Sequence, residues 1–244
     1  MFGGMKSLVE LNLSLNYLSG TIPASIFNLP PHSTIDLGDN QFTTIPWDKI
    51  TNSSGLTSSS LFIVNNKISG SLSHQLYWPY YINLSLNKIE GTLPEYDPQK
   101  DTTRQSTLFI SNNNLSGNIP ESLAQNEGLV FLDVSNNTMM KGVIPEAFVN
   151  ATSLSSLDFN NTRLTCPDSE EWQTFEARVA TTCAFAPAPG DDSSDDDDDD
   201  DGFHIPAIVY VAVAAVFVVI IVVAAFFGYR YWKNRKVSAD LVKI

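Results

Sequence analysis

The sequence is poor in basic residues and in histidine. Lys and Arg number 14 against 27 Asp and Glu, which gives a formal net charge of −13. So acidic a chain disfavours a nucleic-acid partner. The three histidines (His32, His74 and His204) are scattered, and no H-E-x-x-H, G-x-S-x-G or phosphate-cradling glycine motif is present. The sequence therefore predicts a protein that is not an enzyme and needs no cofactor or metal.

What the chain has in quantity is a repeated frame of aliphatic residues around an Asn. Aliphatic or aromatic residues lie five and three positions before each Asn, and another lies two positions after it. The frame occurs at Asn16, Asn40, Asn66, Asn87, Asn113, Asn137 and, with Thr in place of Asn, at Thr162, with spacings of 24, 26, 21, 26, 24 and 25 residues. In the sixth repeat the residue two positions after the Asn is Met139. A period of 20–29 residues with this frame predicts a solenoid of stacked strand-containing repeats.

The frame has a physical reason. Side chains alternate along a strand, so the aliphatic residues at minus five and minus three point the same way and are buried only when repeats stack. The Asn amide offers two donors and an acceptor to the backbone that turns away from the strand. Thr162 can replace part of this function with one hydroxyl.

A second motif, L-x-G-x-[IL]-P, follows the frame at residues 18–23, 89–94 and 115–120. The repeats therefore resemble the plant-type leucine-rich repeats of receptor-like proteins and of leucine-rich-repeat surface antigens. The resemblance covers about residues 5–166. It implies a leucine-rich-repeat solenoid, in which a parallel β-sheet arc has an irregular or short helical convex side. We assign residues 1–165 to this ectodomain.

The C-terminal region predicts a membrane anchor. Residues 207–227 carry no charge and consist mainly of Val, Ala, Ile and Phe, which is long enough to cross about 30 Å of hydrocarbon as a helix. We therefore expect one transmembrane α-helix at residues 205–229. The basic residues in the tail at 230–244 place the C-terminus in the cytoplasm and the repeats outside. This predicts a single-pass protein in the lipid bilayer of the plasma membrane, with a tail too short to hold a kinase.

Residues 184–204 contain nine Asp, at 191, 192 and 195–201. Such a run repels itself and predicts an extended, disordered acidic stalk. A calcium site is the alternative, but the run lacks the Gly turn and the spaced ligands of a calcium loop.

Residues 166–183 are expected to close the C-terminal end of the solenoid. Asp168 and Glu171 resemble a helix capping box, and Trp172, Phe175 and Val179 fall on one helical face. Cys166 and Cys183 bracket this segment, and an even number of cysteines outside the cell favours a disulfide, worth about 3 kcal/mol for a loop of this length.

Seven N-x-[ST] sequons lie on the side assigned as extracellular, and predict N-glycosylation. They are Asn12, Asn52, Asn83, Asn114, Asn136, Asn150 and Asn160. The repeat frame itself generates some of them.

Positions minus six, minus four and minus two are expected to face solvent on the concave side. The candidate ligand-facing residues there are Phe62, Tyr81, Phe109, Phe131, Asp133 and Asp158. Exposed aromatic residues on a rigid sheet are typical binding anchors. Two alternatives remain open: Phe62, Phe109 and Phe131 pack only against one another across adjacent strands, or a glycan on Asn83 or Asn12 obstructs the face.

The chain starts inside a repeat, and an N-terminus outside the cell normally requires an export signal. We therefore expect either that Met1 is an internal start in an incomplete gene model or that the chain is a degraded paralogue. The functional prediction is non-catalytic recognition of an extracellular protein, peptide or glycan, with signalling only through a partner such as a membrane co-receptor. The alternative is a glycosylated structural or shielding surface antigen or adhesion protein without a defined ligand.

Overall fold

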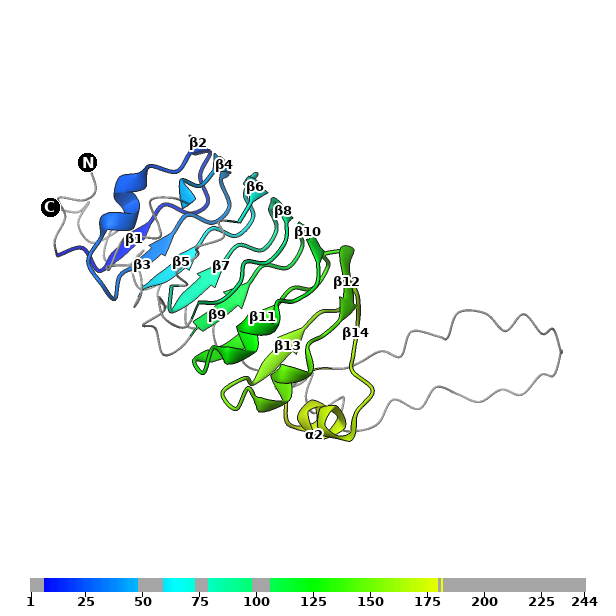
Figure 1. The fold of residues 1–244 in the computed structure, drawn as a ribbon. Helices are drawn as coiled ribbons and strands as arrows, with labels where there is room; N and C mark the ends of the chain where they lie inside the picture. Colours follow the sequence, from blue (N-terminus) through cyan, green and yellow to red (C-terminus); the bar gives the residue numbers. More distant parts are fainter. Residues whose placement is uncertain (1–6, 48–58, 73–78, 98–105, 180, 182–244) are drawn as a thin grey trace, which may run out of the picture. The chain divides into compact units, whose positions relative to one another are not determined.

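The computed structural model describes residues 7–47, 59–72, 79–97, 106–179 and 181. Within these ranges seven strands form one parallel sheet in chain order, side by side (Figure 1). They are β1 (Glu10–Asn12), β3 (Thr34–Asp36), β5 (Ser60–Phe62), β7 (Tyr81–Asn83), β9 (Ser106–Phe109), β11 (Leu129–Asp133) and β13 (Ser156–Asp158). The predicted solenoid is therefore confirmed.

The aliphatic frame forms the core. At minus five and minus three in repeats two to six, the side chains are buried, with Ile35, Leu61 and Ile110 among the most enclosed. Leu11 and Leu13 of the first repeat are only partly buried, because no earlier repeat among the described residues packs on them. Burial by stacking is thus the main stabilising contribution of the array.

The Asn of each frame, which we call the ladder Asn, joins its repeat to the one before it. The Asn113 amide donates to the carbonyls of Ile110 (3.1 Å) and Ser111 (3.2 Å) in its own repeat and of Leu84 (3.0 Å) in the preceding one. Its carbonyl oxygen accepts from the backbone N–H of Ile89 at 2.9 Å. Asn40, Asn66, Asn87 and Asn137 make the same set of bonds. Thr162 instead bonds only within its own repeat.

The residue just before each ladder position adopts a left-handed backbone conformation. The seven residues are Leu15, Asp39, Asn65, Leu86, Asn112, Asn136 and Asn161, with φ between 54° and 59°. A single left-handed residue turns the chain sharply out of the strand. The ladder side chain that follows can then bond to the carbonyls at the end of its own strand, as Asn113 does.

A second series of parallel strands follows the ladder positions (Figure 1), and the expectation of an irregular or short helical convex side did not include it. One sheet contains β6 (Ser69–Ser71), β8 (Lys88–Gly91), β10 (Asn114–Gly117), β12 (Met139–Val143) and β14 (Arg163–Thr165), and a smaller one contains β2 (Ser19–Thr21) and β4 (Gln41–Thr44). Gly117 in β10 has a φ of +77° and lies so close to Thr92 that a Cβ would be 2.9 Å from its Cγ2. Gly117 thus permits the close packing of β10 against the preceding repeat.

The sixth repeat corrects one residue assignment. Met140, not Met139, fills the core position after the Asn: Met140 is fully buried, whereas Met139 is 52% exposed. The inserted residue at the start of β12 moves the side-chain register by one. A one-residue shift exchanges the inner and outer faces of a strand.

Helices complete the described residues: the 3-10 helices η2 (Ala24–Asn28), η3 (Glu121–Gln125) and η4 (Glu146–Asn150), and the α-helix α2 (Glu170–Arg178). The helix α2 buries Trp172 and Phe175 and packs on η4. Its N-cap is Ser169, whose side chain accepts from the backbone N–H of Trp172, so the expected capping position at Asp168 is wrong. Ser169 occupies the residue with extended backbone, which the N-cap geometry requires.

The expected transmembrane helix at 205–229, the stalk at 184–204 and the tail at 230–244 lie outside the described residues. Within the described ranges, no helix has both the length and the apolar character needed to cross a membrane.

Candidate functional site: the solvent face of the seven-stranded sheet

The candidate residues lie on the solvent-facing side of the seven-stranded sheet. In β5, β7 and β13 the middle residue is buried and the two flanking residues are partly exposed, as strand alternation requires. Phe62, Tyr81 and Asp158 are among these flanking residues. These three residues thus lie at strand positions that alternate with the core, and their contact with a ligand stays a prediction.

Three of the candidate aromatic side chains form a continuous row, which we call the aromatic row: Phe62 on β5, Tyr81 on β7 and Phe109 on β9. The ring centroids of Phe62 and Tyr81 are 4.7 Å apart, and those of Tyr81 and Phe109 are 5.7 Å apart. These separations are typical of favourable tilted aromatic pairs. Tyr81 thus joins two rings that the minus-four positions alone leave separated by Asn83.

Tyr81 forms a side-chain hydrogen bond with Asn83 of the same strand. Burial raises the pKa of Tyr81, and a side-chain hydrogen bond with Asn83 acts in the opposite direction. The ring is therefore neutral at physiological pH and serves as an apolar surface with one polar edge.

Phe131 lies apart from the aromatic row. It is 39% exposed and sits on β11 opposite Thr107 and Ser156. Within the described ranges no other ring contacts it. Mutual packing of Phe62, Phe109 and Phe131 is therefore not the arrangement that the strands produce.

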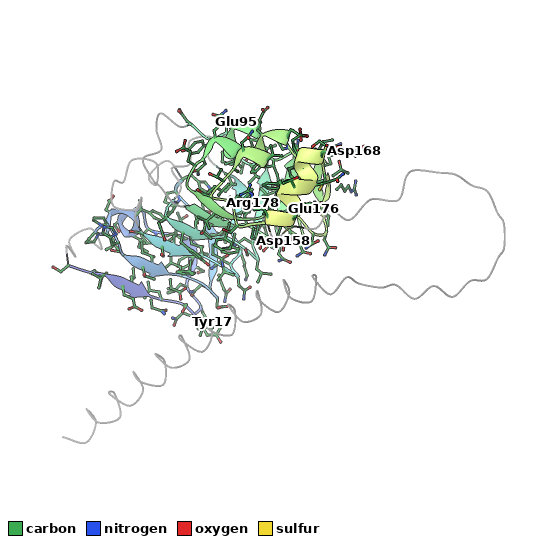
Figure 2. All side chains as sticks on the ribbon, turned by 90° about the horizontal axis from the view of Figure 1, so that it is seen from below. Tyr17, Glu95, Asp158, Asp168, Glu176 and Arg178 are labelled. Carbon is green, nitrogen blue, oxygen red and sulfur yellow. The ribbon has the colours of Figure 1, made fainter. Side chains whose placement is uncertain are left out.

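Asp133 and Asp158 lie opposite each other on the neighbouring strands β11 and β13. One oxygen of Asp133 accepts from the backbone N–H of Ser135 at 2.9 Å and from its Oγ at 2.7 Å. One oxygen of Asp158 accepts from the backbone N–H of Asn160 at 3.0 Å and from its Nδ2 at 2.8 Å. Figure 2 labels Asp158 toward the C-terminal end of the described repeats, where Glu176 and Arg178 of α2 are also labelled.

The pKa of Asp158 is raised above its ordinary value. Partial burial is the largest cause, and the negative charge of Asp133 adds to it, while the hydrogen bonds from Asn160 act against the shift. No described Lys or Arg forms an ion pair with either carboxylate. Among the described residues, the pair is therefore a negative site without a pairing cation.

Sequence reasoning missed a second function of the minus-four positions. In the first, second and fourth repeats, Asn12, Asp36 and Asn83 also accept from the backbone N–H two residues later, at 2.9–3.0 Å. These bonds close the turn that follows the strand. The sequence signal that could have shown this function is an Asn or Asp at minus four, because these side chains accept hydrogen bonds from the backbone N–H two residues later.

Charge is distributed unequally between the two series of strands. The strands of the seven-stranded sheet contain four acidic residues and no Lys or Arg: Glu10, Asp36, Asp133 and Asp158. The second series contains Lys88, Lys141 and Arg163 with one acidic residue, Glu90. The two faces of the described repeats thus differ in the sign of their charge.

The remaining predicted sites are distributed over the solenoid. Of the described sequon residues, Asn12, Asn114, Asn150 and Asn160 are exposed, whereas Asn83 and Asn136 are half-buried. Asn52 lies outside the described residues. Cys166 is half-buried against the core and Cys183 lies outside the described residues, so the disulfide stays a prediction. The described residues contain no group of three His, Cys, Asp or Glu side chains placed to hold a metal ion.

Comparison with known proteins agrees with this architecture. The model of the Leucine Rich Repeat family matches residues 7–29 and 106–126. These residues are leucine-rich repeats. The chain is similar to receptor-like protein 35 of Arabidopsis thaliana, with 32% identity over 166 residues that cover 63% of this chain and 17% of that protein. It is also 28% identical to receptor-like protein 54 of the same plant, over 68% of this chain and 18% of the relative. The chain thus spans about a fifth or less of each of these relatives.

Solved structures show the same fold. The crystal structure of PEPR1-AtPEP1 matches with a TM-score of 0.50 and 28% identity, covering 65% of this chain and 22% of that one. The plant peptide hormone receptor RGFR1 in complex with RGF2 matches with a TM-score of 0.51 and 27% identity, covering 67% of this chain and 30% of that one. A TDR receptor matches with a TM-score of 0.58 at 23% identity over 72% of this chain and 30% of that one, which shows the fold alone.

Proposed function

We propose that this leucine-rich-repeat protein is a non-catalytic, single-pass protein of the plasma membrane that recognises an extracellular peptide or protein. The observation that carries the proposal is the aromatic row, which lies on the solvent side of a rigid sheet beside two unneutralised carboxylates. Partly exposed aromatic side chains on a preformed surface can bind a partner with little loss of conformational entropy. PEPR1-AtPEP1 and RGFR1 with RGF2 support a peptide as the ligand class.

The membrane part of the proposal rests on the sequence. The uncharged residues 207–227 followed by basic residues in the tail orient the repeats outward, and plant receptor-like relatives favour a cell-surface location. The proposal assigns signalling to a membrane co-receptor.

The test is a topology and binding measurement on intact cells that express the full chain with a C-terminal epitope tag. An antibody against the repeats should label intact cells, and an antibody against the tag should label them only after permeabilisation. Selection of peptides from a displayed random library should then yield binders that are lost when Phe109 is replaced. Labelling of the tag without permeabilisation refutes the orientation, and an absence of such binders refutes peptide recognition.

A second candidate function is a glycosylated coat without a defined ligand. It is favoured by Asn83, a sequon residue that lies on β7 within hydrogen-bonding distance of Tyr81, so that a glycan there would lie beside the aromatic row. Glycopeptide mapping decides between them: full occupancy of Asn83 favours the coat, and an unmodified Asn83 favours an open binding face.

A further inference from the structure

The aromatic row and the Asp pair are parts of one continuous surface. Phe109 lies opposite Asp133 on the next strand, and Asp133 lies opposite Asp158 on the strand after that. Neighbouring strands are about 4.8 Å apart, so the midpoint of the two carboxylates lies about 7 Å from Phe109 across the sheet. An extended peptide covers this distance in two residues, at about 3.3 Å per residue.

The charges on this surface favour a positively charged partner. All four charged residues on the strands of the seven-stranded sheet are acidic, and no described cation pairs with Asp133 or Asp158. In each carboxylate, one oxygen caps the backbone of its own repeat, and the hydrogen bonds of the described residues leave the other oxygen unused. Two such oxygens are acceptors for an ammonium or guanidinium group.

We propose that the solvent face of the seven-stranded sheet binds a cationic peptide segment. Its Lys or Arg side chain lies between Asp133 and Asp158, and a large apolar side chain two or three positions away lies on the aromatic row. This inference rests on the proposed function and specifies the ligand of the same site. A bare divalent cation is a poorer match, because calcium requires six to eight oxygen ligands and the described residues gather no such set.

The test replaces the two carboxylates without removing their backbone bonds. Asp133→Asn with Asp158→Asn keeps an acceptor oxygen at each position, and Asn already makes this bond at Asn12 and Asn83. The matched control is Glu121→Gln with Glu127→Gln, which removes the same charge from exposed positions outside the sheet. Circular dichroism and urea unfolding should show that both variants are folded.

Two features of the chain require care in the experiment. Asp133→Asn creates the sequon Asn-Val-Ser, so the full chain is produced in a bacterial host that adds no N-glycans and is purified in detergent. The nine Asp of residues 191–201 would attract any cation, so they are replaced by Ser in every protein compared.

The probe is a random dodecapeptide library displayed on phage. We expect the selected peptides to carry Lys or Arg two or three positions from a large apolar residue. Their affinity should fall about tenfold in the double Asn variant, the loss of one charge-assisted contact of about 1.4 kcal/mol, and should not change in the control.

The outcomes separate this inference from the proposed function. Selected peptides that lack a cation, lose binding on Phe109→Asn and bind the double Asn variant unchanged would overturn the inference and leave peptide recognition intact. Equal losses in the double Asn variant and in the Gln control would also overturn it, because the attraction would then be non-specific. A selection that enriches no peptide would overturn both proposals.

Discussion

The side-chain amide of Asn113 donates a 3.0 Å hydrogen bond to the carbonyl of Leu84, a residue of the preceding repeat. Asn113 is almost fully buried, so water cannot take its place as a hydrogen-bond partner of these backbone groups. The ladder hydrogen bonds consequently stabilise the turn within one repeat and also join two successive repeats.

Asn113→Ala should lower the free energy of unfolding by about 3 kcal/mol, because it leaves several buried backbone groups unpaired. Asn16→Ala is the matched control, since Asn16 is exposed and its side-chain amide donates only within its own repeat, to the carbonyls of Leu13 and Ser14. Its cost should be about 1 kcal/mol or less. Urea unfolding followed by circular dichroism measures both, and equal costs would contradict the role of the ladder between repeats.

Gly117→Ala should destabilise more than Gly20→Ala. Both glycines have a φ near +80°, which costs a residue with a Cβ about 1–2 kcal/mol. Only Gly117 also faces a neighbour at 2.9 Å, whereas Gly20 has open space around it. Thermal unfolding should therefore separate the two variants by several degrees, and identical midpoints would show that Thr92 moves aside without cost.

Arg178→Met should loosen the C-terminal end of the solenoid. The Arg178 guanidinium donates to the carbonyls of Ala151 and Thr152 at 3.2 Å and lies 5.2 Å from the centre of the Phe175 ring. Loss of these bonds should cost about 2 kcal/mol. Arg163→Met, on an exposed residue of β14, is the control and should cost less than about 0.5 kcal/mol. Hydrogen exchange shows where the stability is lost. The backbone amides of α2 should exchange faster in Arg178→Met, and those of the central strands should change less.

Asp158→Asn should change how stability depends on pH. Partial burial and, after it, Asp133 raise the pKa of Asp158 in the folded state above the usual 3.8, so the folded state binds the proton more tightly than the unfolded state. The stability that this carboxyl contributes is present below pH 3.8 and is lost as the pH rises through the folded pKa.

The variant should therefore gain stability over the wild type at neutral pH, and the gain should shrink as the pH falls through the folded pKa toward 3.8, reaching its minimum below that pH. Asp36→Asn is the matched control: Asp36 makes the same bond, to Gly38, but lies between Asn12 and Phe62. Urea unfolding across the pH range measures both variants. A gain that does not vary with pH would show that the effect is not electrostatic.

The sequence predicts the solenoid well because its cause is periodic. The buried aliphatic residues, the strand at each repeat and the inward Asn all follow from alternation and from the need to satisfy backbone groups at a bend. The helix α2 follows from three apolar residues on one face, Trp172, Phe175 and Val179, which are all buried.

Other features depend on neighbours that the sequence does not display. The left-handed residue before each ladder position is Leu, Asp or Asn, so no single residue type marks it. Met139 and Met140 are chemically identical, and only the pairing of β12 with β10 decides which one enters the core. The aromatic row likewise depends on register, which places Tyr81 between two rings 19 and 28 residues away in the chain.

The bonds of the ladder each span one period and no more. A whole repeat can therefore be duplicated or deleted in the gene while every remaining amide still finds a carbonyl and an N–H one repeat away. A change of part of a repeat breaks that match at once. The ladder makes the length of this surface a quantity that recombination can adjust in whole steps.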